Sequence, residues 1–584
     1  MLYTIIQKNN YQDSIVLMLL TNRLLTVDGV SNASVMMGTP ANKDIFKTGG
    51  IYTDEMAAAT SNDMVLVLDI EDKDLIDIVL KEVADFIADQ GKSSGEEGPQ
   101  TVKTWEKALE AGEAAATAVL SIPGTLAAPE IETALEAGKH VFCFSDNVSI
   151  EDEVRLKKMA HDKGLLLMGP DCGTGIINGI PVAFTNAVRK GSIGIVGASG
   201  TGIQEVTTII HKLGAGVTQA LGTGGRDLSE AVGGITVKDS IIALENDPET
   251  KVIVVISKPP APQVRDEVLD LLRKGTKPAV TIFLGEKPTD HEVGLYRAYT
   301  LEEAAQIAVQ LLHEEAVIPI DEMIDQSKTI FSPKQQKIKA YYSGGTLAYE
   351  AAMLVKAGLQ LSEDAAHEDG YILKAQGHEI IDLGDDIYTQ GKPHPMIDPS
   401  KRKEMLQQAA ADPATAVILL DIVLGYGSHA DMASELAPTI KELKANAALA
   451  DRSLAIIGTI VGTDLDPQDI NKQAAILTEA GVTLCQSNAQ AVKKALVLLG
   501  HPLPNITRKL LPKSQPTEAL PQPSEAVVQL LKNQAFINVG LRSFAEAIRE
   551  HHGSVIQYDW QPVAGGNVTL QKALRFLAQA SLKE

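Results

Sequence analysis

The sequence has few cysteines and no long hydrophobic run. Its 584 residues include three cysteines, Cys143, Cys172 and Cys485, which lie too far apart for metal-ligand spacing or a disulfide framework. No window holds about 18 uninterrupted apolar residues, and the first residues are polar where a signal peptide needs an apolar core. We therefore expect a cytoplasmic protein with neither a targeting segment nor a membrane-spanning segment.

Basic residues are outnumbered by acidic ones. Lys and Arg total 52 and Asp and Glu total 75, which gives a formal net charge of −23. An acidic surface repels nucleic-acid phosphates, so we expect no nucleic-acid partner, and a local pocket must hold any anionic substrate. Apolar residues make up 45% of the chain, which is enough for packed cores and excludes wholesale disorder.

The length predicts several domains, at about 100–200 residues each. Residues 1–95 have the pattern of a small α+β domain of the ACT or ferredoxin-like type, followed by a Gly- and Ser-rich linker. In 103–325, and again in 338–500, short apolar runs alternate with amphipathic helices, which is typical of doubly wound parallel sheets. A Pro-rich tether at 501–524 precedes a C-terminal βα docking segment at 525–584.

The two large regions have the pattern of internal copies. GIVGASGTGIQEV (194–206) aligns with AYYSGGTLAYEA (340–351), and VIVVISKPPAP (252–262) aligns with VILLDIVLGYG (417–427). A duplicated βα unit predicts that both copies place equivalent turns at equivalent sheet edges.

A glycine-bearing turn between a predicted strand and a predicted helix occurs in each copy. The first elbow is Ser199, Gly200 and Thr201, and the second elbow is Ser343, Gly344, Gly345 and Thr346. Unpaired N–H groups and the helix dipole suit such a turn to phosphate or carboxylate, although an ordinary helix cap has the same pattern. Because GASGTG (197–202) lacks the P-loop lysine, ATP hydrolysis by this chain alone is not expected.

Two histidines follow predicted strands of the second copy. His394 and His429 are candidates for general acid–base catalysis or for polarising a carbonyl, with Asp398 as an orienting group. Arg402 or Lys401 could hold a carboxylate. The alternatives are a proline-stiffened loop with solvated histidines, or a metal site. No third ligand stands at usable spacing, so we expect no metal.

Arg226 lies in a Gly-rich turn, GTGGRD, and is a candidate anion-binding fork. The equivalent turn of the second copy, residues 382–386, is acidic. Lys258 is expected at the same sheet edge. An ordinary turn is an equally good interpretation of these residues.

Residues 110–310 resemble the α subunit of succinyl-CoA synthetase, through ALEAGKHVFCFSD, MGPDCGTGI, GIVGASGTGIQE and LGTGGRD. Residues 338–500 resemble the carboxyl-terminal domain of its β subunit, through IIDLGDD, VILLDIVLGYG and GTDLDPQDINKQAAILTEAGV. The fusion of these parts, HPMIDP (394–399) and the tail VGLRSFAEAI…DWQPVAGG resemble the FdrA family, whose members carry acyl-CoA synthetase names.

The resemblance implies a CoA-binding Rossmann-like domain at 103–187, followed by two flavodoxin-like ligase domains at 188–325 and 336–500, and it allows CoA as a cofactor. Three synthetase features have no counterpart: the ATP-grasp half, the usual CoA-pyrophosphate loop and the Gly-His-Ala-Gly phosphohistidine loop. The last is replaced by GEKPTDHEVG around His291. ATP-driven thioester formation by this chain alone is therefore not expected.

FdrA-family members of allantoin degradation imply an oxamate carbamoyltransferase with two partner subunits, of the YlbE and YlbF types. The tail (536–566) also resembles the start of the YlbE-type protein. In this interpretation oxamate and carbamoyl phosphate interconvert with oxalurate and phosphate. The elbows would cradle phosphate, His394 or His429 would polarise the carbonyl, and Arg226 or Arg402 would hold the carboxylate. The alternatives are an acyl-CoA synthetase completed by a separate ATP-grasp chain, and a non-catalytic scaffold.

Overall fold

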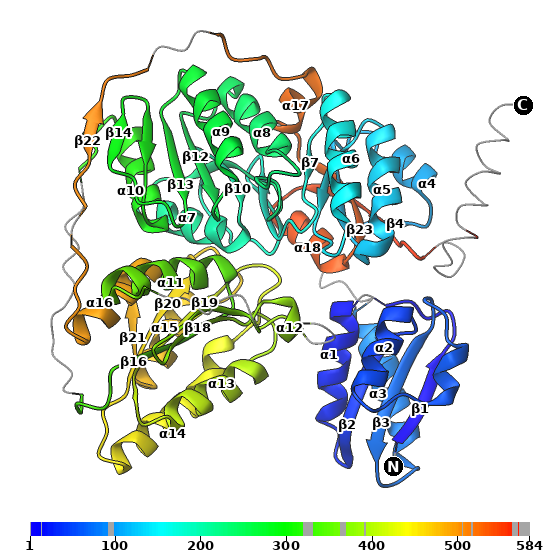
Figure 1. Ribbon diagram of the computed structural model, residues 1–584. Helices are drawn as coiled ribbons and strands as arrows, with labels where there is room; N and C mark the ends of the chain where they lie inside the picture. The colour runs from blue at the N-terminus through cyan, green and yellow to red at the C-terminus, as the bar shows by residue number, and fades with distance from the viewer. Residues whose placement is uncertain are drawn as a thin grey trace, which may run out of the picture.

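The computed structural model describes residues 2–12, 14–90, 98–318, 331–362, 369–389, 393–504, 506–514, 518–562 and 570. These residues form one small and three larger sheets, which helices cover (Figure 1). Residues 91–97 of the expected linker (91–102), the predicted domain end near 325 and most of 563–584 lie outside the described residues, whereas the end of that linker forms a short strand, Gln100–Val102. Among the helices that are described, none is long and apolar enough to cross a membrane.

The N-terminal domain is an antiparallel three-stranded sheet in the order β1-β3-β2. Its elements are β1 (Leu2–Gln7), α1 (Ser14–Leu25), β2 (Val30–Met37), α2 (Pro40–Thr48), the 3-10 helix η1 (Asp54–Ala58), β3 (Met64–Ile70) and α3 (Leu75–Gln90). Alternate residues of β3 face opposite sides. Leu66 and Leu68 pack with residues of α1 and α3, whereas Val65 and Val67 pack with Phe46 of α2. The predicted small α+β domain is confirmed.

The second sheet is parallel, with six strands in the order β4-β24-β23-β5-β6-β7. Its first part contains β4 (Gln100–Val102), α4 (Trp105–Ala111), β5 (Thr117–Ser121), α5 (Gly124–Glu136), β6 (His140–Cys143), α6 (Ile150–Asp162) and β7 (Leu167–Met168). The C-terminal segment contributes α17 (Glu525–Leu530), β23 (Ala535–Gly540), α18 (Arg542–Glu550) and β24 (Ser554–Tyr558). The predicted docking segment therefore lies inside this sheet, beside β5 (Figure 1).

The third sheet has nine strands in the order β22-β14-β15-β13-β12-β10-β11-β8-β9. Its strands are β8 (Thr174–Ile177), β9 (Ile180–Ala183), β10 (Lys190–Ala198), β11 (Val217–Gly222), β12 (Val252–Ser257), β13 (Ala279–Phe283), β14 (Asp290–Glu292), β15 (Leu295–Arg297) and β22 (Lys509–Leu511). Its helices are α7 (Gly200–Lys212), α8 (Ile235–Asn246), α9 (Pro262–Lys274) and α10 (Leu301–Leu312). Strand β22 comes from the predicted tether and pairs with β14 at the sheet edge.

The fourth sheet has six strands in the order β17-β18-β16-β19-β20-β21. Its strands are β16 (Lys337–Tyr342), β17 (Tyr371–Ala375), β18 (His378–Asp382), β19 (Thr415–Val423), β20 (Ala455–Val461) and β21 (Val482–Cys485). Its helices are α11 (Gly345–Leu359), α12 (Asp386–Thr389), α13 (Ser400–Ala411), α14 (Met432–Leu449), α15 (Ile470–Glu479) and α16 (Asn488–Leu498). The order β18-β16-β19-β20 matches β11-β10-β12-β13, as internal duplication requires.

His140, the first residue of β6, forms a hydrogen bond with the C-terminal segment. Its Nδ1 accepts a hydrogen bond from Leu166 N (3.0 Å), and its Nε2 lies 3.0 Å from Ala526 O, to which it donates. Burial lowers the pKa of His140 from 6.5 to about 4. The unfolded chain therefore takes up this proton first, and the folded state loses up to ~3 kcal/mol as the pH falls from about 6.5 toward 4.

We accordingly expect His140→Asn to weaken the pH dependence of stability. The melting temperature of this variant should fall less between pH 7.5 and pH 5 than that of the wild type, because Asn does not titrate. His313→Asn, at an exposed position, should keep the wild-type dependence. Equal slopes for His140→Asn and the wild type would contradict the assignment.

Candidate functional site

The two elbows face each other. The first elbow joins β10 to α7, and the second joins β16 to α11. Ser199 Oγ and Thr346 Oγ1 share a hydrogen bond of 2.8 Å, and Thr346 N lies 3.3 Å from Thr201 Oγ1. The carboxyl edges of the third and fourth sheets therefore meet at this point.

A carboxylate of the protein occupies the second elbow. Asp421, fully buried in β19, accepts from Ser343 N (2.8 Å), Ser343 Oγ (3.0 Å) and Gly344 N (2.8 Å). The buried Arg402 guanidinium also hydrogen-bonds Asp421, at its Oδ1 (3.2 Å) and its backbone carbonyl. The expectation that Ser343, Gly344 and Arg402 bind substrate is thus corrected, because their donors are engaged by an internal anion.

The remaining positions of the second elbow are also enclosed. A Cβ at Gly345 would lie 2.2 Å from Asp382 Oδ2, so the acidic side chain of β18 packs directly on this glycine. Thr346 bonds to the first elbow as described. The second elbow therefore acts as a structural counterpart of the first rather than as a second ligand cradle.

The first elbow keeps its backbone donors. The Ser199 side chain forms no cap on α7. Within the described ranges, the N–H groups of Gly200 and Thr201 donate to no other residue. These two amides, at the positive end of the α7 dipole, are the donors that the sequence pattern predicted.

A lysine and two aspartates lie around the elbows. In the sheet, Ala198 pairs with Ser257 and Tyr342 pairs with Asp382, so Lys258 follows β12 beside Ser199, and Asp382 lies beside Ser343. We call Lys258, Asp171 and Asp382 the junction cluster: Lys258 and Asp171 follow β12 and β7, and Asp382 is the last residue of β18. Lys258 is exposed to solvent, and Asp171 is also exposed as a residue, although the protein around its carboxyl largely desolvates that group.

The surroundings of the junction cluster raise the pKa values of both carboxyls toward neutral pH. Desolvation by the surrounding protein, with repulsion from Asp146, raises the pKa of Asp171 to about 6 against the attraction of Lys258. Desolvation likewise raises the pKa of Asp382 to about 6, opposed by Lys258 and by the hydrogen bond from Gly384 N. Carboxyls with such values can exchange protons near neutral pH.

The two predicted histidines lie on loops that contact each other, since His429 N donates to Met396 O (2.8 Å). In each ring Nδ1 accepts from a backbone N–H two residues ahead: Met396 N for His394 (3.2 Å) and Asp431 N for His429 (3.0 Å). The neutral rings therefore carry hydrogen on Nε2. Burial, and next the charge of Arg402, lower the pKa of His394 to about 4.

His394 adjoins the junction cluster. A Cβ at Gly384 would lie 2.7 Å from His394 Nε2 and 3.1 Å from Asp382 Oδ1. Because glycine has no Cβ, the His394 ring and the Asp382 carboxyl can both lie close to this backbone position. Asp398 follows on the same loop, where its Oδ1 accepts from Ser400 N (2.8 Å) and Ser400 Oγ (2.6 Å) at the start of α13. Its role as an orienting group stays a prediction.

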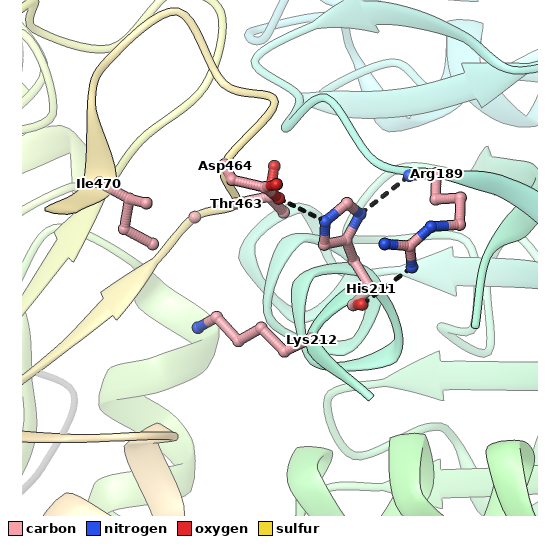
Figure 2. A pocket seen from close by; sticks show the side chains of 7 residues that line it. Arg189, His211, Lys212, Thr463, Asp464 and Ile470 are labelled. Carbon is pink, nitrogen blue, oxygen red and sulfur yellow. Dashed lines mark hydrogen bonds and ion pairs between the residues drawn. The ribbon is translucent and has the colours of Figure 1, made fainter. Parts of the chain in front are cut away.

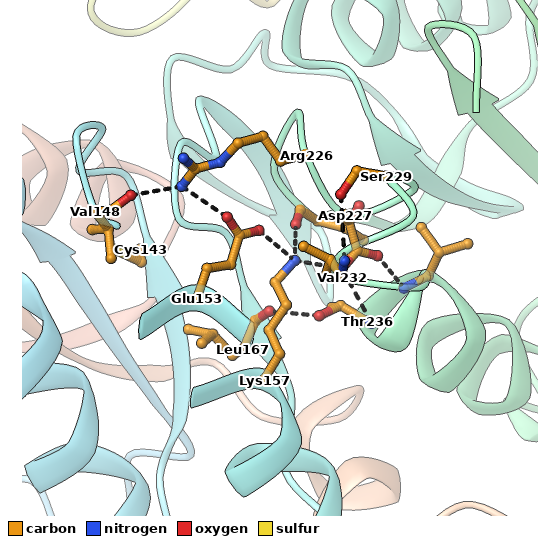
Figure 3. Close-up of polar contacts among 12 residues, drawn as sticks. Cys143, Val148, Glu153, Lys157, Leu167, Arg226, Asp227, Ser229, Val232 and Thr236 are labelled. Atoms are coloured by element: carbon orange, nitrogen blue, oxygen red, sulfur yellow. Dashed lines mark hydrogen bonds and ion pairs between the residues drawn. The ribbon is translucent and has the colours of Figure 1, made fainter. Parts of the chain in front are cut away.

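Arg226 connects its own loop to α6 and to the residues just before it. Its Nη2 contacts Val148 O (2.8 Å) and Glu153 Oε2 (2.8 Å). Figure 3 shows that Glu153 also faces Lys157 (3.3 Å), which pairs with Asp227 in a fully buried network. The Arg226 side chain stays 42% exposed. Its positive charge opposes the rise in the pKa of Asp171, so the guanidinium lies close enough to act at the same sheet edge.

Asp171 and Asp382 were not singled out as site residues. Each stands at the end of a buried strand, Asp171 in MGPD and Asp382 in IID. An acidic residue at the carboxyl end of a parallel strand is the signal that would have indicated both.

Three family models match the chain. The model described as "AllF, heavy metal-associated domain" matches residues 1–103, "CoA binding domain" matches 188–285 and "CoA-ligase" matches 341–498. The CoA-binding match covers β10 to β13, C-terminal to the 103–187 stretch in which we expected that domain.

The residues of the N-terminal domain do not fit a heavy metal. Residues 1–103 contain neither Cys nor His, which are the usual ligands of heavy metals, and Met37, Met56 and Met64 are buried in the core. Within the described part of the chain, no three His, Cys, Asp or Glu side chains could together hold a metal ion.

Curated relatives identify the family. "Uncharacterized protein YahF" of Escherichia coli K12 is 42% identical over 497 residues, which is 83% of this chain and 96% of that protein. Succinate–CoA ligase [ADP-forming] subunit alpha 2 of Archaeoglobus fulgidus is 28% identical over 29% of this chain and 58% of its own length. The ADP-forming sulfoacetate-CoA ligase subunit SqwL of an Acholeplasma species is 29% identical over 29% and 57%. The chain thus spans a little over half of these two ligase subunits, and its match to nearly all of YahF shows that it belongs to the FdrA family, with CoA-ligase-like domains.

Proposed function

We propose that this chain is a subunit of a cytoplasmic carbamoyltransferase complex of purine and allantoin catabolism, assembled with YlbE-type and YlbF-type partners. It would interconvert oxamate and carbamoyl phosphate with oxalurate and phosphate. The observation that carries the proposal is the position of the junction cluster beside the first elbow: backbone anion donors and Lys258 adjoin two carboxyls whose pKa values are about 6.

The groups at this edge suit each part of the transfer. The oxamate nitrogen attacks the carbamoyl carbon and loses a proton to a carboxylate, Asp171 or Asp382, both of which are ionised above pH 6. The bond from this carbon to the phosphate oxygen breaks, and phosphate leaves with the electron pair.

The N–H groups of Gly200 and Thr201, together with Lys258, would hold the phosphate, and Nε2–H of His394 could donate to the carbonyl oxygen. Arg226, with its exposed guanidinium, suits the oxamate carboxylate better than the buried Arg402 does.

The second candidate is an acyl-CoA ligase completed by a separate ATP-grasp chain. The CoA-ligase and CoA-binding matches favour it, and a CoA phosphate could use the first elbow in the same way. A phosphohistidine is not supported, because His291 stands in GEKPTDHEVG, without the glycine-alanine setting of the synthetase loop, and lies in β14, where its Nδ1 accepts from Arg297 N (3.2 Å).

The test compares the purified chain alone with the chain plus its two proposed partners. We expect oxamate-dependent phosphate release from carbamoyl phosphate by the complete complex only. ATP-dependent CoA thioester formation with an added ATP-grasp chain, and no carbamoyl transfer, would favour the ligase instead. Full activity of an intact complex that carries both His394→Ala and His429→Ala would point to a non-catalytic scaffold.

A further inference from the structure

A cavity of about 310 Å³ lies between the third and fourth sheets, at the carboxyl end of α7. Its lining consists of Arg189, His211, Lys212, Gly462, Thr463, Asp464 and Ile470 (Figure 2). Helix α7 rises about 1.5 Å per residue from Gly200 to Lys212, which separates the cavity from the first elbow by about 18 Å. The cavity is therefore distinct from the junction cluster.

The lining is rich in cationic groups. Arg189 uses Nη1 to cap the carbonyls of His211 (3.1 Å) and Ala215 (2.9 Å), while its other guanidinium nitrogens bond to no residue that the structure describes. His211 accepts from Arg189 N at Nδ1 (3.0 Å), so Nε2–H donates to Asp464 Oδ1 (2.7 Å). The one acid of the lining is thus already hydrogen-bonded. Arg189 and Lys212 supply positive charge: desolvation lowers the pKa of Lys212, and the nearby carboxylates of Glu205 and Asp466 oppose this shift and favour its charged form.

The walls of the cavity are held in place by buried bonds between the sheets. Thr463 Oγ1 donates to Ala187 O (2.5 Å), and Thr463 N donates to Asp466 (2.8 Å), which also accepts from Asn186. Lys212 Nζ donates to Ile460 O (3.1 Å). A pre-formed cavity of this kind loses little freedom when a ligand binds.

Ile470 is the one large apolar side chain of the lining. We propose that this cavity binds a small organic anion, with its carboxylate or phosphate head on Arg189 and Lys212 and its carbon skeleton against Ile470.

The test uses isothermal titration of the full chain with three probes: succinate, butyrate and inorganic phosphate. We expect saturable binding, with the carboxylates ahead of phosphate if the head is a carboxylate and the reverse order if it is a phosphate. Arg189→Met should weaken binding at least tenfold by removing the fork. Ile470→Glu, at the first residue of α15, should do the same by placing a negative charge in the cavity without removing the Arg189 caps.

Two controls make the result specific. Arg155→Met, in a surface ion pair on α6, should leave the affinity unchanged. Lys258→Met should leave the affinity for succinate and butyrate unchanged, since that lysine lies at the other end of α7 and is assigned to phosphate at the first elbow. The proposal is overturned if no probe binds saturably, if Arg189→Met and Ile470→Glu bind as the wild type does, or if Lys258→Met abolishes the binding of succinate and butyrate.

Discussion

Replacing Asp421 with alanine is expected to lower the free energy of unfolding by about 3–5 kcal/mol. The substitution removes the carboxylate that accepts from Ser343 N, Ser343 Oγ and Gly344 N, and it leaves the Arg402 charge buried without its partner. An unpaired buried charge and unsatisfied donors are the costliest consequences of a single substitution. Urea denaturation of the full chain measures the loss.

Two companion experiments separate the carboxylate from simple loss of packing. Inorganic phosphate should raise the melting temperature of Asp421→Ala more than that of the wild type, because the variant exposes the second elbow to an external anion. The double variant Arg402→Met/Asp421→Leu should be more stable than Asp421→Ala, since it buries no unpaired charge. Wild-type stability of Asp421→Ala would contradict the assigned role of Asp421.

Lys258→Met should reduce kcat/KM for carbamoyl transfer by the assembled complex by about 10²–10³-fold, if the proposed function holds. Lys258 lies beside the first elbow, which would hold the phosphate in the proposed function, and its charge opposes the rise in the pKa of both Asp171 and Asp382. Without it, both carboxyls should titrate above 6. The acidic limb of the pH–rate profile should then move to higher pH, because a base with a raised pKa stays protonated over more of the range.

Lys251→Met is the matched control for this change. Lys251 is exposed like Lys258, but it precedes β12, whereas Lys258 follows the same strand. The control should keep wild-type kcat/KM and the wild-type pH profile. A Lys258→Met complex with normal kinetics would remove the junction cluster from the mechanism.

Local patterns predicted most of the architecture. The strands predicted before the two elbows, at 193–196 and 339–342, lie within β10 (Lys190–Ala198) and β16 (Lys337–Tyr342), because buried parallel strands leave short apolar runs bounded by turns. The position of β23 beside β5 was not predictable in the same way. More than 400 residues separate the two strands, and period and composition carry no information about which strand will pair with which.

Only the local part of the candidate site could be predicted, because a sequence pattern does not show contacts between distant residues. The duplicated turns correctly indicated two helix N-termini at equivalent sheet edges, yet a single sequence shows neither that they face each other nor that Asp421 fills one of them from 78 residues away. A charged residue inside the apolar run VILLDIVLG was the available signal, since a lone buried acid needs donors nearby. The buried Arg402 in α13, by contrast, has no local pattern that distinguishes it from a surface arginine.

The insertion of β23 and β24 next to β5 has a consequence for biosynthesis. The 390 residues between Met168 and Tyr558 must leave the ribosome before this sheet can close, which takes about 20–80 s at typical translation rates. During that interval the open edge of β5 can pair with strands of other nascent chains. Chaperone occupancy should therefore persist on the early translated part until synthesis ends.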